Sequence, residues 1–571
     1  MSQAAVGLRQ SGRRTRRPLA AVRRRLAEWL VAAWVAFDAP PDGRRIRGSI
    51  PVFLVGTALS GGLAVYTVTT GWNFAYTDAM AHLTIARRVF DSPHPGIQQL
   101  GTVWLPFPHL LLLPFVGSLY LWRTGIAGAI IGALSFGVSS ASLFRILARI
   151  GVDGVGRAVA LLVFWLNPNL LYLSTTALTE PVLIATLLAC IAGLVGWATS
   201  PRRLSGGELA VFAGLPAAAA VLTRYEGWAL TMSGTCYVAL HCWRQRLAWR
   251  RWVAYLSAFT VPPILAVLAW IAYNYSQYGN PLDFWDGPYS AAQFNIGFRY
   301  EGVLQTAGNL GLSTRVFGVS MYEDFGLFPI LLAAAGLVVM SLRWGLGQRA
   351  LTVWLAATSS AFLLFSLWQG QHVIMNAASL PPGDFNNRQT ISGLPWIALL
   401  AGVLFGMWRG RRLVRGLLVA AVAGGLLWQN LWWKADYYDR SSILAEAIVQ
   451  SHASAGRTAA SLWLHRHYDG GGLLLDETSI ASAPQIGIPL RQYYDRDNGA
   501  AFQQALHDPA RYVRWIMMHV EPGKEDGDVH DDDQVTRAMR KVPQFSAEFA
   551  VVFRSGTLEV LRRIGAPAVA R

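Results

Sequence analysis

"IPVFLVGTALSGGLAVYTVTTGW" (residues 50–72) is an apolar run about as long as a helix needs to cross a lipid bilayer. It is followed almost at once by "YTDAMAHLTIARRVF" (residues 76–90), which carries an aspartate, a histidine and two arginines. Ionisable side chains are costly so close to lipid, and where they occur they indicate a functional site. The sequence therefore predicts a transmembrane helix with a functional site next to its C-terminal end.

Composition extends this prediction to most of the chain. Of the 571 residues, 53% are hydrophobic and only 14% are charged, against roughly 25% charged in an ordinary soluble domain. Apolar stretches of about 17 to 24 residues recur up to about residue 433. A soluble protein of this length would instead form several cores joined by polar linkers. We therefore expect an α-helical polytopic membrane protein.

The net charge of +16 does not indicate nucleic-acid binding, because the arginines come in short clusters between apolar segments. This distribution is typical of the positive-inside bias, so membrane lipids are expected partners and nucleic acid is not. The three cysteines, Cys190, Cys236 and Cys242, lie in or beside apolar segments and are too far apart for a metal-ligand spacing. They predict no disulfide framework.

We expect about eleven transmembrane helices, because the apolar runs alternate with Arg-rich connections that all fall on one side. The N-terminus is then cytoplasmic, the C-terminus is extracytoplasmic, and the protein is integral to the plasma membrane. The predicted spans are 49–71, 125–148, 157–173, 178–198, 207–223, 228–243, 252–273, 315–341, 350–368, 392–408 and 415–433.

Three domains are predicted. Residues 1–48 form a basic cytoplasmic arm with an interfacial helix whose Trp29 and Trp34 face lipid. Residues 49–433 form the transmembrane catalytic domain, with a first outer loop at 72–124 whose short apolar run, broken by Pro114, lies in the interface. Residues 434–571 form an extracytoplasmic α/β domain.

Within the last domain, "GGLLLDE" (471–477) and "ARYVRWIMMHV" (510–520) predict short buried strands, and "FAVVFRSGTLEVLRR" (549–563) predicts a hairpin. "EPGKEDGDVHDDDQ" (521–534) is polar and acidic, which predicts a mobile loop; it lacks the spacing of a known Ca²⁺ loop.

Asp78 is the first candidate functional residue. We expect a helix to start near Thr77, so that Asp78 lies in its first turn and His82 lies four residues on, on the same face. The structural alternative is that Thr77 caps this helix and Asp78 only complements its dipole. His82 is then a paired neighbour.

Other candidates lie at the outer ends of predicted spans, where nearly all acidic residues before the last domain gather. Glu180 opens a span in "STTALTEPVL", where Pro181 is tolerated in the first turn. A carboxylate can deprotonate a hydroxyl group, and an arginine offers a planar fork to a phosphate. One outer pocket for an anionic head group would use these residue types. The remaining candidates are Arg224 and Glu226, which could form only an ion pair, Asp283, and Arg388, which could only pair with Asp384.

At these residues the chain resembles the GT-C superfamily of polyprenyl-phosphate-sugar-dependent glycosyltransferases, nearest the branch of the protein O-mannosyltransferases and the lipid A aminoarabinose transferase. The resemblance covers roughly residues 50–410. It rests on "DAMAHLTIARRVFDSPHPGIQQLGTVWLPFPHLLLLP" (78–114), "NPNLLYLSTTALTEPVL" (167–183), "LTRYEGWAL" (222–230) and "YGNPLDFWDGPYS" (278–290).

The resemblance implies a GT-C-like fold and an inverting transfer of a hexose or pentose from a polyprenyl phosphate to a hydroxyl group of the cell envelope, at the outer leaflet. Asp78 matches the catalytic aspartate, Glu180 an acid lining the site, and Arg388 a basic residue near the donor phosphate. Ala79 stands where the family often has a second acid. Whether the enzyme uses a divalent cation therefore stays open, and Asp91 is the candidate for the missing second acid.

Three other functions stay open at this stage. A secondary transporter would also place ionisable groups in its spans, although transporters bind near the midplane and often show repeats, and we find no internal repeat. A scaffold whose last domain binds a partner would not need so many spans. A glycan polymerase or ligase would keep the same site but use a lipid-diphosphate donor.

Overall fold

The computed structural model describes the chain from Ile46 to Gly565, apart from gaps at 102, within 288–301, and at 407–409, 436–442, 522–532 and 543–544. Before Ile46 it describes only Arg24, Ala27 and Glu28. The expected interfacial helix with Trp29 and Trp34, and most of the acidic loop at 521–534, therefore lie outside the described residues.

Each predicted span contains helix in its described residues. In the described part of the chain, seven helices are long and apolar enough to cross a membrane, and a pair bent by 49° makes an eighth if it is one span. The seven are α3 (Ser49–Thr70), α7 (Ile126–Arg149), α10 (Glu180–Thr199), α14 (Trp249–Tyr278), α18 (Leu327–Trp344), the η4–α21 segment (Asn387–Gly406) and α22 (Arg412–Ala435). The bent pair is α19 (Gln348–Leu355) and α20 (Thr358–Trp368). The other predicted spans correspond to α8 (Gly154–Trp165), α11 to α12 (Gly206–Val221) and α13 (Glu226–Arg244).

Two predicted spans had the wrong limits. The span predicted at 315–341 is interrupted at Gly326, whose φ of +80° ends α17 (Leu310–Phe325) before α18 begins. The span predicted at 157–173 is interrupted at Asn167, whose side chain caps the short helix α9 (Pro168–Leu173) by accepting from the Leu170 amide. Pro168 cannot continue α8 because it has no N–H group.

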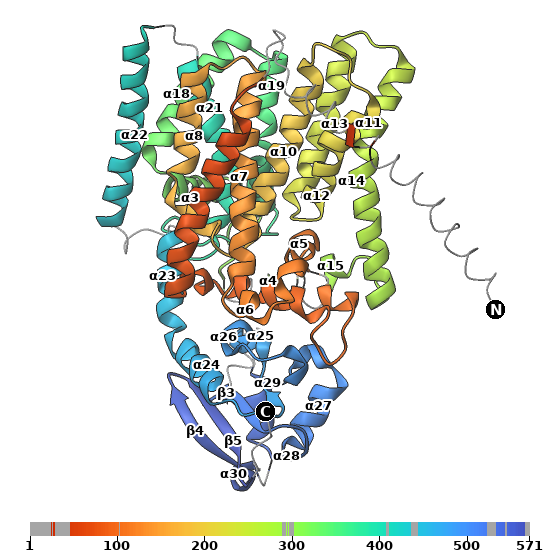
Figure 1. Cartoon of the computed structure of the whole chain (residues 1–571), viewed down its shortest axis with the longest axis vertical. Coiled ribbons are helices and arrows are strands. Elements are labelled where there is room, and N and C mark those ends of the chain that lie inside the picture. Colours follow the sequence, from red (N-terminus) through yellow and green to blue (C-terminus); the bar gives the residue numbers. More distant parts are fainter. Residues whose placement is uncertain are drawn as a thin grey trace, which may run out of the picture.

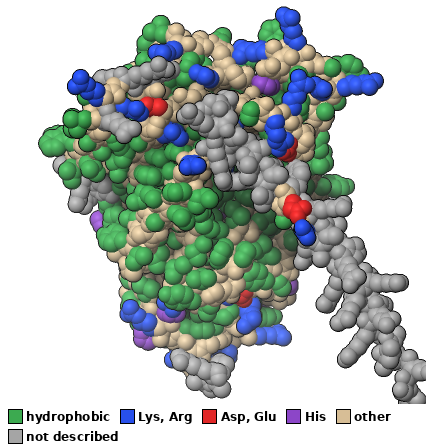
Figure 2. Space-filling model, turned by 45° about the horizontal axis from the view of Figure 1, so that its top comes forward, with side chains coloured by type: hydrophobic (Ala, Val, Ile, Leu, Met, Phe, Trp, Pro, Cys, Tyr) green, Lys and Arg blue, Asp and Glu red, His purple; other side chains and the backbone are tan. Residues whose placement is uncertain are grey.

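The helices form a bundle, and a layer of short helices separates its lower end from the C-terminal domain (Figure 1). This layer contains α4 (Thr77–Arg88), α5 (Phe107–Val116), α6 (Leu119–Arg123) and α15 (Asp283–Asp286). With ten residues, α5 is only about 15 Å long, too short to cross a bilayer. On the face seen in Figure 2, hydrophobic side chains cover the middle of the bundle, and many Lys and Arg side chains lie at the end opposite the C-terminal domain.

The C-terminal domain contains a five-stranded mixed sheet in the order β2-β1-β3-β5-β4. β1 (Leu473–Leu474) pairs in parallel with β2 (Tyr493–Tyr494) and β3 (Trp515–His519), while β5 (Leu558–Arg563) pairs antiparallel with β3 and β4 (Phe549–Ser555). The predicted strands and hairpin are confirmed. The helices of this domain are α23 (Ile443–Ala453), α24 (Ala455–His467), α25 (Glu477–Ile480), α26 (Ala483–Ile486), α27 (Ala500–His507), α28 (Pro509–Tyr512), α29 (Gln534–Met539) and α30 (Phe545–Glu548).

Polar contacts fix this domain against the layer of short helices. Arg88, at the end of α4, pairs with Asp495 at 2.8 Å and with Asp497. Arg123 in α6 donates to the His465 ring at 2.6 Å. The C-terminal domain therefore contacts α4 and α6 directly, in addition to its covalent connection through α22.

Close helix packing depends on small residues, as expected where lipid supplies no hydrophobic driving force between helices. At Gly193 in α10, a Cβ atom would lie 1.9 Å from the Phe212 carbonyl oxygen, which belongs to the π-helical turn between α11 and α12. At Gly61 in α3, by contrast, a Cβ atom would meet nothing within 4 Å.

We expect Gly193→Ala to lower the stability of the detergent-solubilised protein by about 1–3 kcal/mol, because backbone must move to admit the methyl group. Gly61→Ala is the matched control, and its better helix propensity should leave stability unchanged or raise it by up to about 1 kcal/mol. Thermal midpoints of the two variants check this. Equal midpoints would contradict the packing interpretation.

Candidate active site

The candidate site lies where several helices begin, at the end of the bundle that faces the C-terminal domain. α4 begins at Thr77 and places Asp78 in its first turn, as predicted. Its N-cap is Tyr76, with no capping bond from a side chain, so the alternative in which Thr77 caps the helix is wrong. Glu180 and Glu226 are the first residues of α10 and α13, and Arg388 is the second residue of η4.

Five of the predicted residues form one chain of ion pairs. Arg388 donates to the Asp78 carboxylate through Nη2, and its Nε lies 3.6 Å from Glu180 Oε1. The same Glu180 oxygen accepts from Arg224 Nη1 at 3.3 Å. Arg224 Nε in turn lies 3.2 Å from Glu226 Oε1. We call this set the ion-pair chain: Asp78, Arg388, Glu180, Arg224 and Glu226.

The members of the ion-pair chain are buried or partly buried, and Asp78 at one end is the most exposed. The side chains of Glu180 and Glu226 are 2% exposed and that of Arg388 is 10% exposed, whereas that of Asp78 is 35% exposed. Arg388 Nη1 and Glu180 Oε2 are buried without a hydrogen-bond partner. Asp78 is therefore the member that an incoming molecule meets, and Arg388 beside it keeps a donor for a further acceptor.

Two residues that sequence reasoning missed support Arg388. Its guanidinium group lies over the Tyr76 ring at 4.9 Å, and the Tyr76 hydroxyl donates to the Ile443 carbonyl at 3.0 Å. Glu446, in α23 of the C-terminal domain, accepts from the Asn386 amide at 3.2 Å. The only sequence signal for Glu446 is one carboxylate inside the apolar run "ILAEAIV".

His82 contacts a second histidine and a tryptophan. Its Nδ1 lies 2.9 Å from Nε2 of His109 in α5, and its ring contacts Trp104 with centroids 4.4 Å apart. Burial lowers the pKa of His82 to about 4, and burial also lowers the pKa of His109. The two rings are therefore neutral near pH 7 and form a wall beside the ion-pair chain.

Asp91, Asp283 and Asp384 are not members of the ion-pair chain. Asp91 pairs with Arg87 at 2.6 Å, and both side chains are buried. Asp283 begins α15, whose Phe284 ring packs near Tyr225 and Trp228. Asp384 lies 3.4 Å from the Asn387 side chain, while Arg388 pairs with Asp78 and Glu180.

Within the described residues, no group of three or more His, Cys, Asp or Glu side chains is placed to hold a metal ion. The ion-pair chain contains three carboxylates, but two guanidinium groups are interleaved among them. Each carboxylate thus already faces a cation.

Two solved structures share this fold. ArnT from Cupriavidus metallidurans bound to undecaprenyl phosphate is 14% identical over 89% of this chain and 99% of ArnT, with a TM-score of 0.52. ArnT from Cupriavidus metallidurans in the apo state is 13% identical over 89% of this chain and 98% of ArnT, with a TM-score of 0.51. No family model matches the sequence, and no curated protein matches it.

At this level of identity the likeness shows the fold. The chain is a polytopic helical membrane protein of GT-C-like fold with a C-terminal domain containing a small sheet, as the sequence predicted.

The pKa of Glu446 yields a test of the contact between α23 and the site. Burial, opposed by the attraction of Arg388, raises this pKa from its ordinary 4.5 to about 7. The folded chain therefore holds a proton that the unfolded chain releases, so stability is highest below about pH 4.5 and falls as pH rises to about 7.

We expect Glu446→Gln, which stays neutral, to have a flatter dependence of stability on pH than the wild type. The two proteins should have similar thermal midpoints near pH 5, and the variant should be the more stable near pH 8. Thermal denaturation across this range measures the difference. Parallel curves would contradict the raised pKa.

Proposed function

We propose that this protein is a membrane glycosyltransferase that moves a sugar from a polyprenyl-phosphate donor to a hydroxyl group of the cell envelope, with inversion at the anomeric carbon. The observation that carries the proposal is the Asp78–Arg388 pair, which sets a half-exposed carboxylate beside a buried guanidinium group with an unused donor. The fold supports it, because a structure with the same fold is bound to undecaprenyl phosphate.

Arg388 would hold the donor phosphate. Its Nη1 is buried without a partner, and an arginine fork suits two phosphate oxygens. Glu180 lies near Nε, and the Tyr76 ring lies under the guanidinium group. These contacts hold the guanidinium group in place before a ligand binds. Arg224 shares Glu180 with Arg388 and adds a second positive charge to the same site.

Asp78 would act as the general base. It takes the proton of the acceptor hydroxyl as that oxygen bonds to the anomeric carbon, while the bond from the anomeric carbon to the phosphate oxygen breaks. The electron pair leaves with the polyprenyl phosphate, whose charge becomes more negative. Fixed cations are most effective where charge develops, in a site partly screened from water.

The site would lie at the outer leaflet. The ion-pair chain lies at one end of the bundle, next to the C-terminal domain, and Arg-rich connections lie at the other end (Figures 1 and 2). The positive-inside bias then places the C-terminal domain outside the cell. A charge cluster at one end favours an enzyme over a transporter, whose site would lie near the midplane.

We expect Asp78→Asn to lower the rate of sugar transfer by roughly 10²–10⁴-fold, because the amide cannot accept the acceptor proton. Binding of polyprenyl phosphate should persist. Asp286→Asn, which neutralises an exposed carboxylate that pairs with Asn280, is the matched control and should transfer at the wild-type rate. Transfer is measured with a panel of polyprenyl-phosphate sugars. Wild-type turnover by the Asp78 variant would reject the assigned base.

We expect Arg388→Gln to weaken binding of polyprenyl phosphate by roughly 10- to 100-fold, the usual effect of losing a hydrogen bond to a charged group. Arg388→Lys keeps the charge but loses the fork, so its affinity should be intermediate. Binding to the purified chain, compared between a polyprenyl monophosphate and a diphosphate, also separates a monophosphate donor from the diphosphate donor of a polymerase or ligase. Unchanged affinity in the glutamine variant would contradict the role of Arg388.

A further inference from the structure

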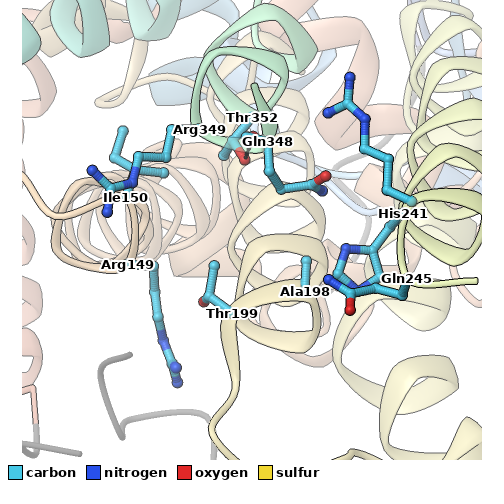
Figure 3. A pocket seen from close by; sticks show the side chains of 10 residues that line it. Arg149, Ile150, Ala198, Thr199, His241, Gln245, Gln348, Arg349 and Thr352 are labelled. Atoms are coloured by element: carbon cyan, nitrogen blue, oxygen red, sulfur yellow. Dashed lines mark hydrogen bonds between the residues drawn. The ribbon is translucent and has the colours of Figure 1, made fainter. Parts of the chain in front are cut away.

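A cavity lies at the end of the helices opposite to the ion-pair chain. It has a volume of about 350 Å³ and is formed where α7, α10 and α13 end and where α19 begins (Figure 3). α10 carries Glu180 as its first residue and Thr199, which lines this cavity, as its last. A helix of 20 residues is about 30 Å long, so the cavity is separated from the ion-pair chain by about the thickness of a bilayer core.

The side chains around this cavity are basic or neutral. Arg149, Arg244 and Arg349 contribute to its wall, together with His241, and no Asp or Glu is among the lining residues. Gln348, Thr199 and Thr352 add uncharged polar groups. In Figure 3 the labelled side chains of α7, α10, α13 and α19 surround one open space.

The helix ends do not cancel this positive charge. The three helices that end here present carbonyl groups, each end equivalent to about half a negative charge, while α19 presents its positive N-terminal end. The two exposed guanidinium groups, those of Arg244 and Arg349, outweigh these partial charges. The acidic residues near this end are engaged elsewhere, Asp153 with Arg415 and Glu208 with Arg202.

Two of the arginines are held in place at the mouth. Arg244 donates to the Leu346 carbonyl at 2.9 Å, which ties the end of α13 to the loop before α19. Arg349 lies with its guanidinium carbon 5.9 Å from the centre of the Trp344 ring. Both side chains are exposed, so they can meet a ligand at the level where lipid head groups lie.

From these observations we propose that the cavity binds a phosphate-bearing anion, the head group of an anionic phospholipid. A basic pocket between transmembrane helices at the Arg-rich end is suited to such a head group. Its volume lies in the range of small-ligand sites and admits a phosphate with a short polar substituent. This proposal does not depend on the sugar-transfer reaction at the other end.

The test uses the purified full-length chain in detergent, titrated with phosphatidylglycerol or phosphatidylcholine and followed by native mass spectrometry. The wild type should retain phosphatidylglycerol in preference to phosphatidylcholine. The double variant Arg244→Gln, Arg349→Gln should bind phosphatidylglycerol roughly tenfold or more weakly, since each arginine near a lipid phosphate contributes substantially to the attraction. Arg250→Gln is the matched control, because Arg250 is exposed and does not line the cavity.

Two further measurements keep the proposal falsifiable. Ala198→Phe fills the cavity without changing its charge, and it should also weaken binding; full binding by this variant would place the lipid on the surface and overturn the proposal. Equal loss in the Arg250 variant, or equal binding by all variants, would overturn it as well. Displacement of the lipid by millimolar inorganic phosphate would assign the site to a soluble phosphate and overturn the phospholipid proposal.

Discussion

The contact of Arg388 with both Asp78 and Glu180 is the interaction on which the arrangement of this end of the molecule depends. It joins α4 of the first outer loop, α10 of the bundle and the start of the η4–α21 segment. A buried guanidinium group without carboxylates would be strongly destabilising, and each buried carboxylate here needs its cation. Arg224 pairs with both Glu180 and Glu226 and so connects α13 to the same set of ion pairs. Charge pairing therefore fixes the positions of four segments far apart in the sequence.

The C-terminal domain takes part in this constraint. Glu446 bonds the backbone just before Arg388, and the Ile443 carbonyl holds the hydroxyl of Tyr76, whose ring lies under the guanidinium group. Arg88 and Arg123 fix the same domain to α4 and α6. The domain thus supports Arg388 from the side opposite the bundle. A domain that only bound a partner would not need these contacts with the site.

The sequence predicted the helical segments, the strands of the C-terminal domain and five members of the ion-pair chain, because each depends on local patterns. Hydropathy marks a span, and a charge at a helix start is visible without coordinates. Asp91 shows the limit of this reasoning: its pairing with Arg87 across one helical turn looks no different in sequence from a functional acid. Glu446 and Tyr76 were missed because their role arises only when α23 folds back on the first outer loop. Gly326 and Asn167 broke two predicted spans because backbone conformation and capping outweighed apolar composition there.

In the proposed reaction, the position of Arg388 between Asp78 and the phosphate has a further consequence. With all five members ionised, the ion-pair chain carries one net negative charge, and a bound phosphodiester adds another. When Asp78 takes the acceptor proton it loses its charge, while the leaving phosphate gains one, so the total is unchanged and only its location shifts. Arg388 contacts Asp78 through Nη2 and has an unused donor at Nη1, so its pairing can follow the charge with little movement. A preorganised cation that faces both the start and the end of a charge shift lowers its barrier without solvent rearrangement. In the proposed mechanism, this is the reason for assigning one arginine to both the base and the donor phosphate.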